Sequence, residues 1–282
     1  MKIRLIVWLT ACMVFSVLFF GELWTKLPQW LSPVGLQSHG IEGWGILGLC
    51  TLSLWLKRKD ILPGMQVARP DPLSIIAGVA LLALSIFLPS SDTFLIFLML
   101  LGWLGVFVII FNRACLIPSM LLAIYGFSLV LPTLIIRGLG EPAAMATANI
   151  LTAITRMVGL PVTSVGLVLH ITTLTGDVIS VTVGPTCIGY RAISLFIALF
   201  SVMMLDIRLP LSKAWYMFLL GLLGTWLQNI TRLIVIVAAG YYWGAGALEA
   251  THQNISYFIF PVWYALFVYI YLRQAKRKKT SI

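Results

Sequence analysis

The sequence predicts an all-α integral membrane protein of about eight transmembrane helices, with both termini on the cytoplasmic side. Of its 282 residues, 60% are hydrophobic and only 10% are charged, whereas soluble domains have roughly 45–50% apolar and about 25% charged residues. Apolar runs near the roughly 20 residues needed for one membrane crossing recur along the chain. This composition excludes an ordinary soluble enzyme, a disordered chain and a disulfide-stapled secreted module.

The predicted spans follow these apolar runs in order. Lys2 and Arg4 precede the first run, and no small-x-small cleavage site follows it. We therefore expect a retained helix with its amino end inside, not a cleaved signal peptide. A loop containing Trp and Pro is expected from there to Gly40. The eight predicted spans cover residues 3–20, 41–56, 72–88, 93–111, 114–136, 187–205, 214–239 and 254–272.

The basic residues predict the orientation, because cytoplasmic loops of membrane proteins collect Lys and Arg. With eight spans and the amino end inside, only five of the 19 Lys and Arg fall on the outer side. These five are Lys26, Arg137, Arg156, Arg191 and Arg232. The net charge of +10 is therefore interpreted as a topology signal, and a nucleic-acid partner is not expected.

Residues 137–186 depart from this pattern, since they contain no long apolar run. The segment from Glu141 to Val158 has apolar residues at three- to four-residue spacing, which predicts an amphipathic helix. Two β-branched runs within 162–183, separated by Thr175-Gly176-Asp177, predict a β-hairpin. An unpaired hairpin edge cannot lie in lipid. We therefore divide the chain into a five-helix membrane region (1–136), an extracytoplasmic segment (137–186) and a three-helix membrane region (187–282).

Three chemically active side chains are predicted to meet at the outer face. Cys187 opens the sixth span, and its position at a helix amino end favours the thiolate. Arg232 lies 18 residues into the seventh span, about 27 Å along the helix and close to the outer boundary. His252 precedes the eighth span, which enters from the same side. A thiolate nucleophile needs a nearby cation or base, and an arginine can stabilise the oxyanion of an acyl-transfer intermediate.

The other three cysteines, Cys12, Cys50 and Cys115, lie in or next to apolar runs and are interpreted as small core residues. The cysteines show no C-x-x-C spacing, so neither a disulfide framework nor a zinc site is expected. We expect no metal and no cofactor. The absence of an H-E-x-x-H motif disfavours a metalloprotease.

Two short motifs in the C-terminal half contain Cys187 and Arg232: Thr186-Cys187-Ile188-Gly189 and Asn229-Ile230-Thr231-Arg232. They resemble the C-x-G box and the N-x-x-R box of the exosortase/archaeosortase family. His252 matches the family's histidine, and the order Cys, Arg, His is the same. The resemblance extends over roughly residues 145–272.

The resemblance implies a multi-pass enzyme of the cell membrane, a cysteine protease or transpeptidase whose active site faces outside. Its substrates would be secreted proteins with a C-terminal sorting tail, which consists of a short motif, a transmembrane helix and basic residues. The acceptor of the cleaved protein is held to be a lipid-linked amine or a similar group in archaeal members. Cys187 would be the nucleophile, Arg232 would hold the thiolate and the oxyanion, and His252 would be the general acid and base.

Four further residues have supporting roles in this interpretation. Arg191 follows Cys187 by four residues, which would place both on one helix face, as a second cation or as a snorkelling anchor. Asn229 would orient Arg232 or hydrogen-bond across helices. Thr186 and Gly189 belong to the C-x-G box. The predicted hairpin would cover the site or hold an extended substrate by strand addition.

Two other classes of function are weighed against this one. A transporter or channel predicts ionisable residues at mid-bilayer and repeated halves, and the chain shows neither pattern. A non-enzymatic membrane scaffold predicts no requirement for a thiol. Mutation of Cys187 separates the scaffold from the enzyme.

Overall fold

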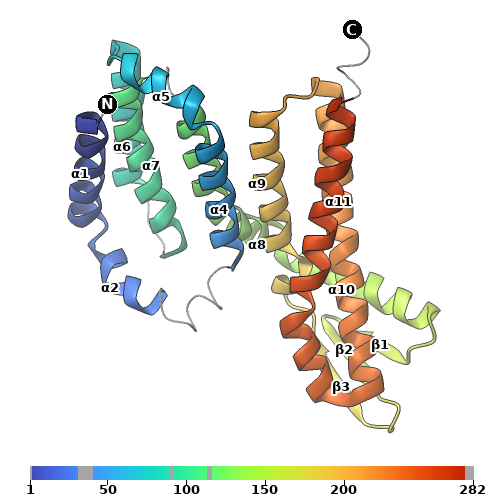
Figure 1. The fold of residues 1–282 in the computed structure, drawn as a ribbon. Coiled ribbons are helices and arrows are strands. Elements are labelled where there is room, and N and C mark those ends of the chain that lie inside the picture. The colour runs from blue at the N-terminus through green and yellow to red at the C-terminus, as the bar shows by residue number, and fades with distance from the viewer. Residues whose placement is uncertain (1, 31–40, 89–91, 113–115, 277–282) are drawn as a thin grey trace. The chain divides into compact units, whose positions relative to one another are not determined.

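The computed structural model describes residues 2–30, 41–88, 92–112 and 116–276, which form helices and one small sheet (Figure 1). Three helical stretches are long and apolar enough to cross a membrane, at 94–111, 116–157 and 211–276. Shorter apolar helices cover 3–19, 43–56 and 72–87. The all-α membrane class is thereby confirmed, while the number of spans and their orientation stay predictions. The chain forms two compact units, residues 1–131 with 197–206, and residues 132–196 with 207–282.

The first unit contains α1 (Lys2–Phe19), α2 (Gly21–Trp30), α4 (Ile41–Leu56), α5 (Arg58–Val67), α6 (Pro72–Phe87) and α7 (Asp92–Phe111). Glycines let α6 and α7 approach closely: a Cβ on Gly78 would lie 2.6 Å from the carbonyl oxygen of Gly105. Small residues at helix interfaces serve this purpose in membranes. Lys57 forms a 2.8 Å ion pair with Asp206, the last residue of α9 (Tyr190–Asp206).

Two helices of this unit differ from the expectation. The segment predicted as a loop after the first span contains α2, although Pro28 lies within it, and its continuation at 31–40 is outside the described residues. The helix α5 begins directly after Lys57, where charged residues end the predicted second span. Both helices are only 10 residues long and less apolar than the spans, so hydropathy alone does not reveal them.

The long helix α8 (Leu116–Met157) joins two elements that the sequence predicts as separate. It continues through Pro132 and Pro142, which membrane helices tolerate because neighbouring groups satisfy the freed backbone. Its end is a Schellman motif: the N–H of Leu160 donates to Thr155 over 2.9 Å and that of Gly159 to Arg156 over 3.0 Å. Gly159 has a φ of +82°, which glycine adopts without strain.

A three-stranded antiparallel sheet follows, in the order β1 (Val162–Val165), β2 (Val168–Thr172) and β3 (Val178–Thr182). The β2–β3 pair is the predicted hairpin. The additional strand β1 pairs with β2 through a two-residue turn in which Gly166 has a φ of +61°. Glycine at the first position of such a turn is typical of a type II′ hairpin. The first of the two β-branched runs within 162–183 therefore contains a chain reversal.

The C-terminal helices form one long helical hairpin whose turn is Gly244, with φ +83° and ψ −173°. The structure assigns α10 (Leu211–Asn254) and α11 (Ser256–Lys276). Residues at equal sequence separations before and after Gly244 contact each other, as the two arms of a hairpin require. Trp263 Nε1 donates to Thr225 Oγ1 over 3.1 Å, and a Cβ on Gly240 would lie 2.7 Å from the Leu248 side chain. The first arm, 211–243, is about 50 Å long, so its tip extends beyond a bilayer core of about 30 Å.

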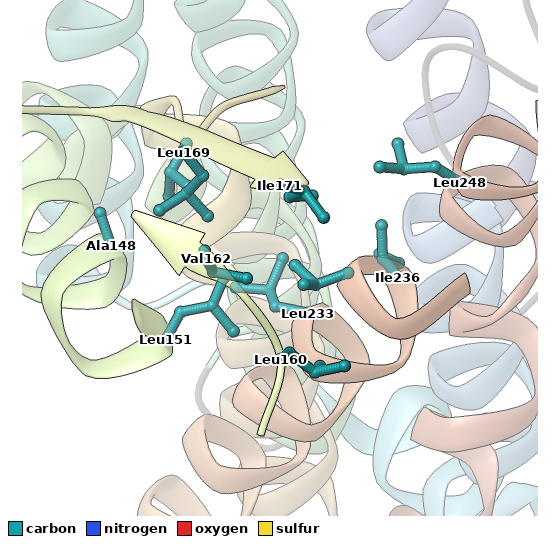
Figure 2. Packing of buried hydrophobic residues seen from close by; sticks show 11 residues of the cluster. Ala148, Leu151, Leu160, Val162, Leu169, Ile171, Leu233, Ile236 and Leu248 are labelled. Carbon is teal, nitrogen blue, oxygen red and sulfur yellow. The ribbon is translucent and has the colours of Figure 1, made fainter. Parts of the chain in front are cut away.

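The sheet packs against this tip of the hairpin (Figure 1). Figure 2 shows the apolar core between them, to which α8, the strands and α10 all contribute. Its buried members are Ala148, Leu151, Leu160, Val162, Leu169, Ile171, Val183, Leu233, Ile236, Val237 and Leu248. Because sheet edges are not stable in lipid, we expect the part of the hairpin that packs on the sheet to lie outside the hydrocarbon core.

Gly224→Ala is expected to destabilise the hairpin. A Cβ at this position would lie 1.9 Å from the indole ring of Trp263, which is fixed by its hydrogen bond to Thr225. Such overpacking costs about 1–3 kcal/mol, and the thermal midpoint in detergent should fall by about 2–4 °C per kcal/mol. Gly246→Ala is the matched control, since no atom lies within 4 Å of its Cβ position. Equal midpoints for the two variants would contradict the close contact.

Candidate active site

Cys187 lies in a 3₁₀ turn, η2 (Pro185–Ile188), between the end of the sheet and α9 (Tyr190–Asp206). Its N–H donates to the carbonyl of Gly184 over 2.9 Å, which closes the turn. The side chain is half-buried and packs against the apolar core of the sheet. The helix therefore begins three residues later than the sequence predicts. Cys187 therefore lies in a tight turn before the helix, and both its N–H and its carbonyl group are hydrogen-bonded.

Asn229 of α10 connects this turn to the helical hairpin. Its Nδ2 donates to the carbonyl of Cys187 over 2.8 Å, across 42 residues of sequence. The side chain is 1% exposed, and its Oδ1 is buried without a hydrogen-bond partner among the described residues. A buried, unsatisfied amide oxygen is costly. The Asn229 side chain is therefore held by one hydrogen bond to the backbone of Cys187. Its Oδ1 is an additional acceptor next to that turn.

Gly189 provides the space that this contact needs. Its φ is +78°, and a Cβ there would lie 2.8 Å from Cγ of Asn229. Only glycine combines this backbone conformation with so close an approach. The glycine of the C-x-G box is therefore explained physically: it reverses the chain after Cys187 and lets Asn229 reach the turn.

Arg232 lies one helical turn beyond Asn229 on the same arm of the hairpin. It is half-buried, and its Nε is a buried atom. His252 lies on the returning arm, eight residues after Gly244, whereas Arg232 lies 12 residues before it. The antiparallel pairing therefore places the two side chains about one helical turn apart. This arrangement brings the histidine to the level of the N-x-x-R box.

The environment of His252 favours its neutral form. Partial removal of the imidazole from water lowers the pKa of His252, the positive charge of Arg232 lowers it further, and the carboxylate of Glu249 opposes both effects. Since the ordinary value is 6.5, the ring is mostly neutral at neutral pH. A neutral imidazole beside a cation can accept a proton and return it later, as a general base and acid must.

The remaining predicted residues are placed as follows. Thr186 is the second residue of η2. Arg191 is exposed and donates from Nε to the hydroxyl of Tyr190 over 3.1 Å, with its guanidinium beside that ring. The argument that Arg191 shares a helix face with Cys187 is wrong, because Gly189 adopts a left-handed conformation between them and the helix begins only at Tyr190. Cys12 and Cys50 are buried as predicted, and Cys115 lies outside the described residues.

Two features of this region are not predicted by the sequence analysis. Glu249 accepts a hydrogen bond from Gln253, four residues later on the helix, over 2.8 Å. Its carboxylate also raises the pKa of His252. Gly244 reverses the chain within a run of helix-compatible residues. The signal for it is the cluster of glycines at 244 and 246, which follows three aromatic residues.

The arrangement suits acyl transfer at the edge of a membrane. It combines a thiol in a rigid turn, a guanidinium that can stabilise negative charge and a mostly neutral imidazole. Cys187 packs against the apolar core between the sheet and the helical hairpin, and Arg232 is the neighbour in sequence of Leu233 in that core.

A comparison with protein-family models gives one match, which covers residues 24–269, to the model described as transmembrane exosortase. No curated protein and no solved structure matches the chain. The match includes the whole of the sheet, the Cys187 turn and both arms of the helical hairpin up to residue 269.

Proposed function

Because this chain belongs to the transmembrane exosortase family, which consists of membrane protein-sorting enzymes, we propose that it is a cysteine transpeptidase acting at the outer face of the cell membrane. The observation that carries this proposal is the 2.8 Å hydrogen bond from Asn229 to the carbonyl of Cys187. It joins the turn that bears the thiol to the helix that bears Arg232, which supports a single site built from the two sequence boxes.

In the first half of the proposed reaction, His252 takes the proton of the Cys187 thiol, and the resulting thiolate attacks the scissile carbonyl so that an S–C bond forms. Arg232 stabilises the thiolate and then the oxyanion of the tetrahedral intermediate. The C–N bond breaks as His252 gives a proton to the leaving amine. The products are a thioester on Cys187 and the released sorting tail.

In the second half, an acceptor nucleophile attacks the thioester while His252 removes its proton. The C–S bond breaks, the thiol of Cys187 is regenerated, and the secreted protein is attached to the acceptor. The proposed substrates are secreted proteins with a C-terminal tail of motif, transmembrane helix and basic residues. A lipid-linked amine is the proposed acceptor, since such a molecule reaches the site from the same bilayer. The tail helix fixes the depth of the motif, which raises its effective concentration.

The test is a processing assay with a secreted reporter that carries a candidate sorting tail encoded in the same genome. Intact mass of the reporter is measured with and without this chain, and after treatment of cells with a membrane-impermeant thiol reagent. We expect loss of the tail only with the chain, an added mass from the acceptor, and inhibition by the reagent with labelling of Cys187. If the reporter is still processed after Cys187 has been labelled by the reagent, the cysteine mechanism is wrong.

The pH dependence of processing should respond to Glu249. If proton transfer by His252 limits the reaction, the acid limb of the profile reports its deprotonation and lies below pH 6.5. Glu249→Gln removes the one contribution that raises the pKa of His252, so the limb should move to lower pH. Glu141→Gln, which removes a carboxylate from α8, should leave the profile unchanged. A limb that moves to higher pH in Glu249→Gln would contradict the assignment.

A further inference from the structure

The two edges of the sheet differ in whether their backbone groups are occupied. On β1, the carbonyl of Val162 accepts from Arg156 Nε over 2.8 Å, and its N–H donates to Leu160 over 2.9 Å. The edge of β1 is therefore closed at Val162 by the end of α8. Closing an edge in this way prevents pairing with another chain.

The edge of β3 is open, as the hydrogen-bond register shows. The N–H of Thr173 donates to Asp177 and that of Val183 to Leu167, over 2.7 and 2.8 Å. Bonded and non-bonded pairs alternate in an antiparallel ladder, so Ile179 and Val181 bond to β2. The N–H groups of Val178, Ser180 and Thr182 then point away from the sheet. Within the described part of the chain, no hydrogen bond from another segment reaches these three N–H groups.

The side chains of β3 agree with an accessible edge. Its residues alternate between exposed and half-buried, whereas Leu169 and Ile171 of the central strand are buried. Val178 is 63% exposed. Unpaired backbone groups on an exposed strand are a template for an additional strand.

The direction of β3 connects this edge to the reaction. The strand runs into Gly184 and the turn of Cys187, after which α9 begins at Tyr190. Since the sheet lies outside the hydrocarbon core and α9 is apolar, β3 runs from the outer compartment toward the bilayer. A secreted substrate with a C-terminal tail helix also runs from outside into the bilayer. Both chains therefore have the same direction.

We propose that the extended segment of the substrate upstream of the scissile bond binds as a fourth strand, parallel to β3, through the outward N–H groups of Val178, Ser180 and Thr182 and the outward carbonyl groups of Val178 and Ser180. The carbonyl of Thr182 already accepts from the N–H of Gly184 over 3.1 Å. This inference rests on the proposed function. Backbone pairing of this kind gives affinity without strict dependence on side chains. It delivers the scissile bond to Cys187, because β3 continues directly into that turn.

The first part of the test compares Ser180→Pro with Ser180→Ala. Both variants lose the 2.9 Å contact between the Ser180 hydroxyl and His170 Nδ1, but only the proline also loses the outward N–H. Proline is tolerated on an edge strand at such a position. Processing by Ser180→Pro should fall about tenfold or more, and that by Ser180→Ala should stay within about twofold. Labelling of Cys187 by the impermeant reagent checks that each variant is folded and inserted.

The second part measures direction by cysteine cross-linking in a Cys187→Ala background, which retains the substrate. Val178→Cys and Thr182→Cys are each combined with single cysteines along the upstream segment of the reporter. Parallel pairing predicts that Thr182→Cys links to reporter positions about four residues nearer the tail than Val178→Cys does. Val165→Cys, on the closed edge and 71% exposed, is the control and should not link.

The outcomes separate this inference from the proposed function. If Cys187→Ala still processes the reporter, the proposed function itself fails. If processing needs Cys187 but Ser180→Pro equals Ser180→Ala and neither β3 cysteine links, strand addition is overturned. The reverse order of cross-links would overturn the parallel direction.

Discussion

Cys187→Ala is expected to abolish processing of a matched reporter, with a fall in rate of at least about a thousandfold. Alanine removes only the sulfur atom, keeps an apolar side chain and should preserve the turn, since the backbone bonds of residue 187 to Gly184 and Asn229 do not involve sulfur. No thioester can then form. Cys187→Ser should also lose at least about a hundredfold, because a serine hydroxyl is a weak nucleophile without a strong base. The measurement is the fraction of reporter at the processed mass over time.

The matched control for this variant is Cys50→Ala. Cys50 is a buried thiol of the other compact unit, with its sulfur 3.7 Å from the carbonyl oxygen of Leu121. Its replacement removes one thiol without touching the proposed site. Processing normalised to the amount of chain in the membrane should equal that of the wild type. Wild-type processing by Cys187→Ala would instead support the membrane-scaffold interpretation or a different nucleophile.

Gly189→Ala is expected to reduce processing about a hundredfold while the chain stays in the membrane. The left-handed backbone costs about 1–3 kcal/mol for a residue with a Cβ. The added methyl group would also lie 2.8 Å from Cγ of Asn229. Relief of this contact requires movement of Asn229 or of the turn, and a displacement of about 1 Å at a reacting group costs on the order of a hundredfold.

Gly138→Ala is the control for this second variant, because it adds the same methyl group to α8, where no atom lies within 4 Å of the Cβ position. It should process at the wild-type rate. A second readout is the accessibility of Cys187 to the impermeant thiol reagent, which should change in Gly189→Ala and not in Gly138→Ala. Unchanged processing and labelling in Gly189→Ala would show that the contact with Asn229 does not position the thiol.

The membrane helices illustrate how far hydropathy alone can predict the fold. The predicted spans at 41–56, 72–88 and 93–111 agree with α4, α6 and α7 to within one residue at each end. These helices are set by apolar length, which the sequence shows directly. In contrast, α2 and α5 have lower hydropathy, and the continuity of α8 through two prolines depends on packing by neighbouring segments. Such effects leave no periodic signal in the sequence.

The sheet and the hairpin show a second limit of the sequence. The β-branched runs and the Thr175-Gly176-Asp177 turn predict the β2–β3 hairpin, because these local preferences act within a few residues. The sequence does not indicate that Gly166 divides one run into two strands, since a single glycine is compatible with a continuous strand. It predicts a chain reversal between the spans at 214–239 and 254–272, but not that helix continues on both sides as far as Gly244. Only the packing of the flanking segments decides between these conformations.

The sequence by itself determined the membrane class, the family resemblance and the candidate residues Cys187, Arg232 and His252, because each depends on residue type and order. The tertiary structure decided that Asn229 bonds to the backbone of Cys187, that Gly189 separates Cys187 from the face of α9, and that the edge of β3 is open while that of β1 is closed. The Asn229 bond joins segments 42 residues apart. These features depend on the distances that a folded chain sets, which no local pattern encodes.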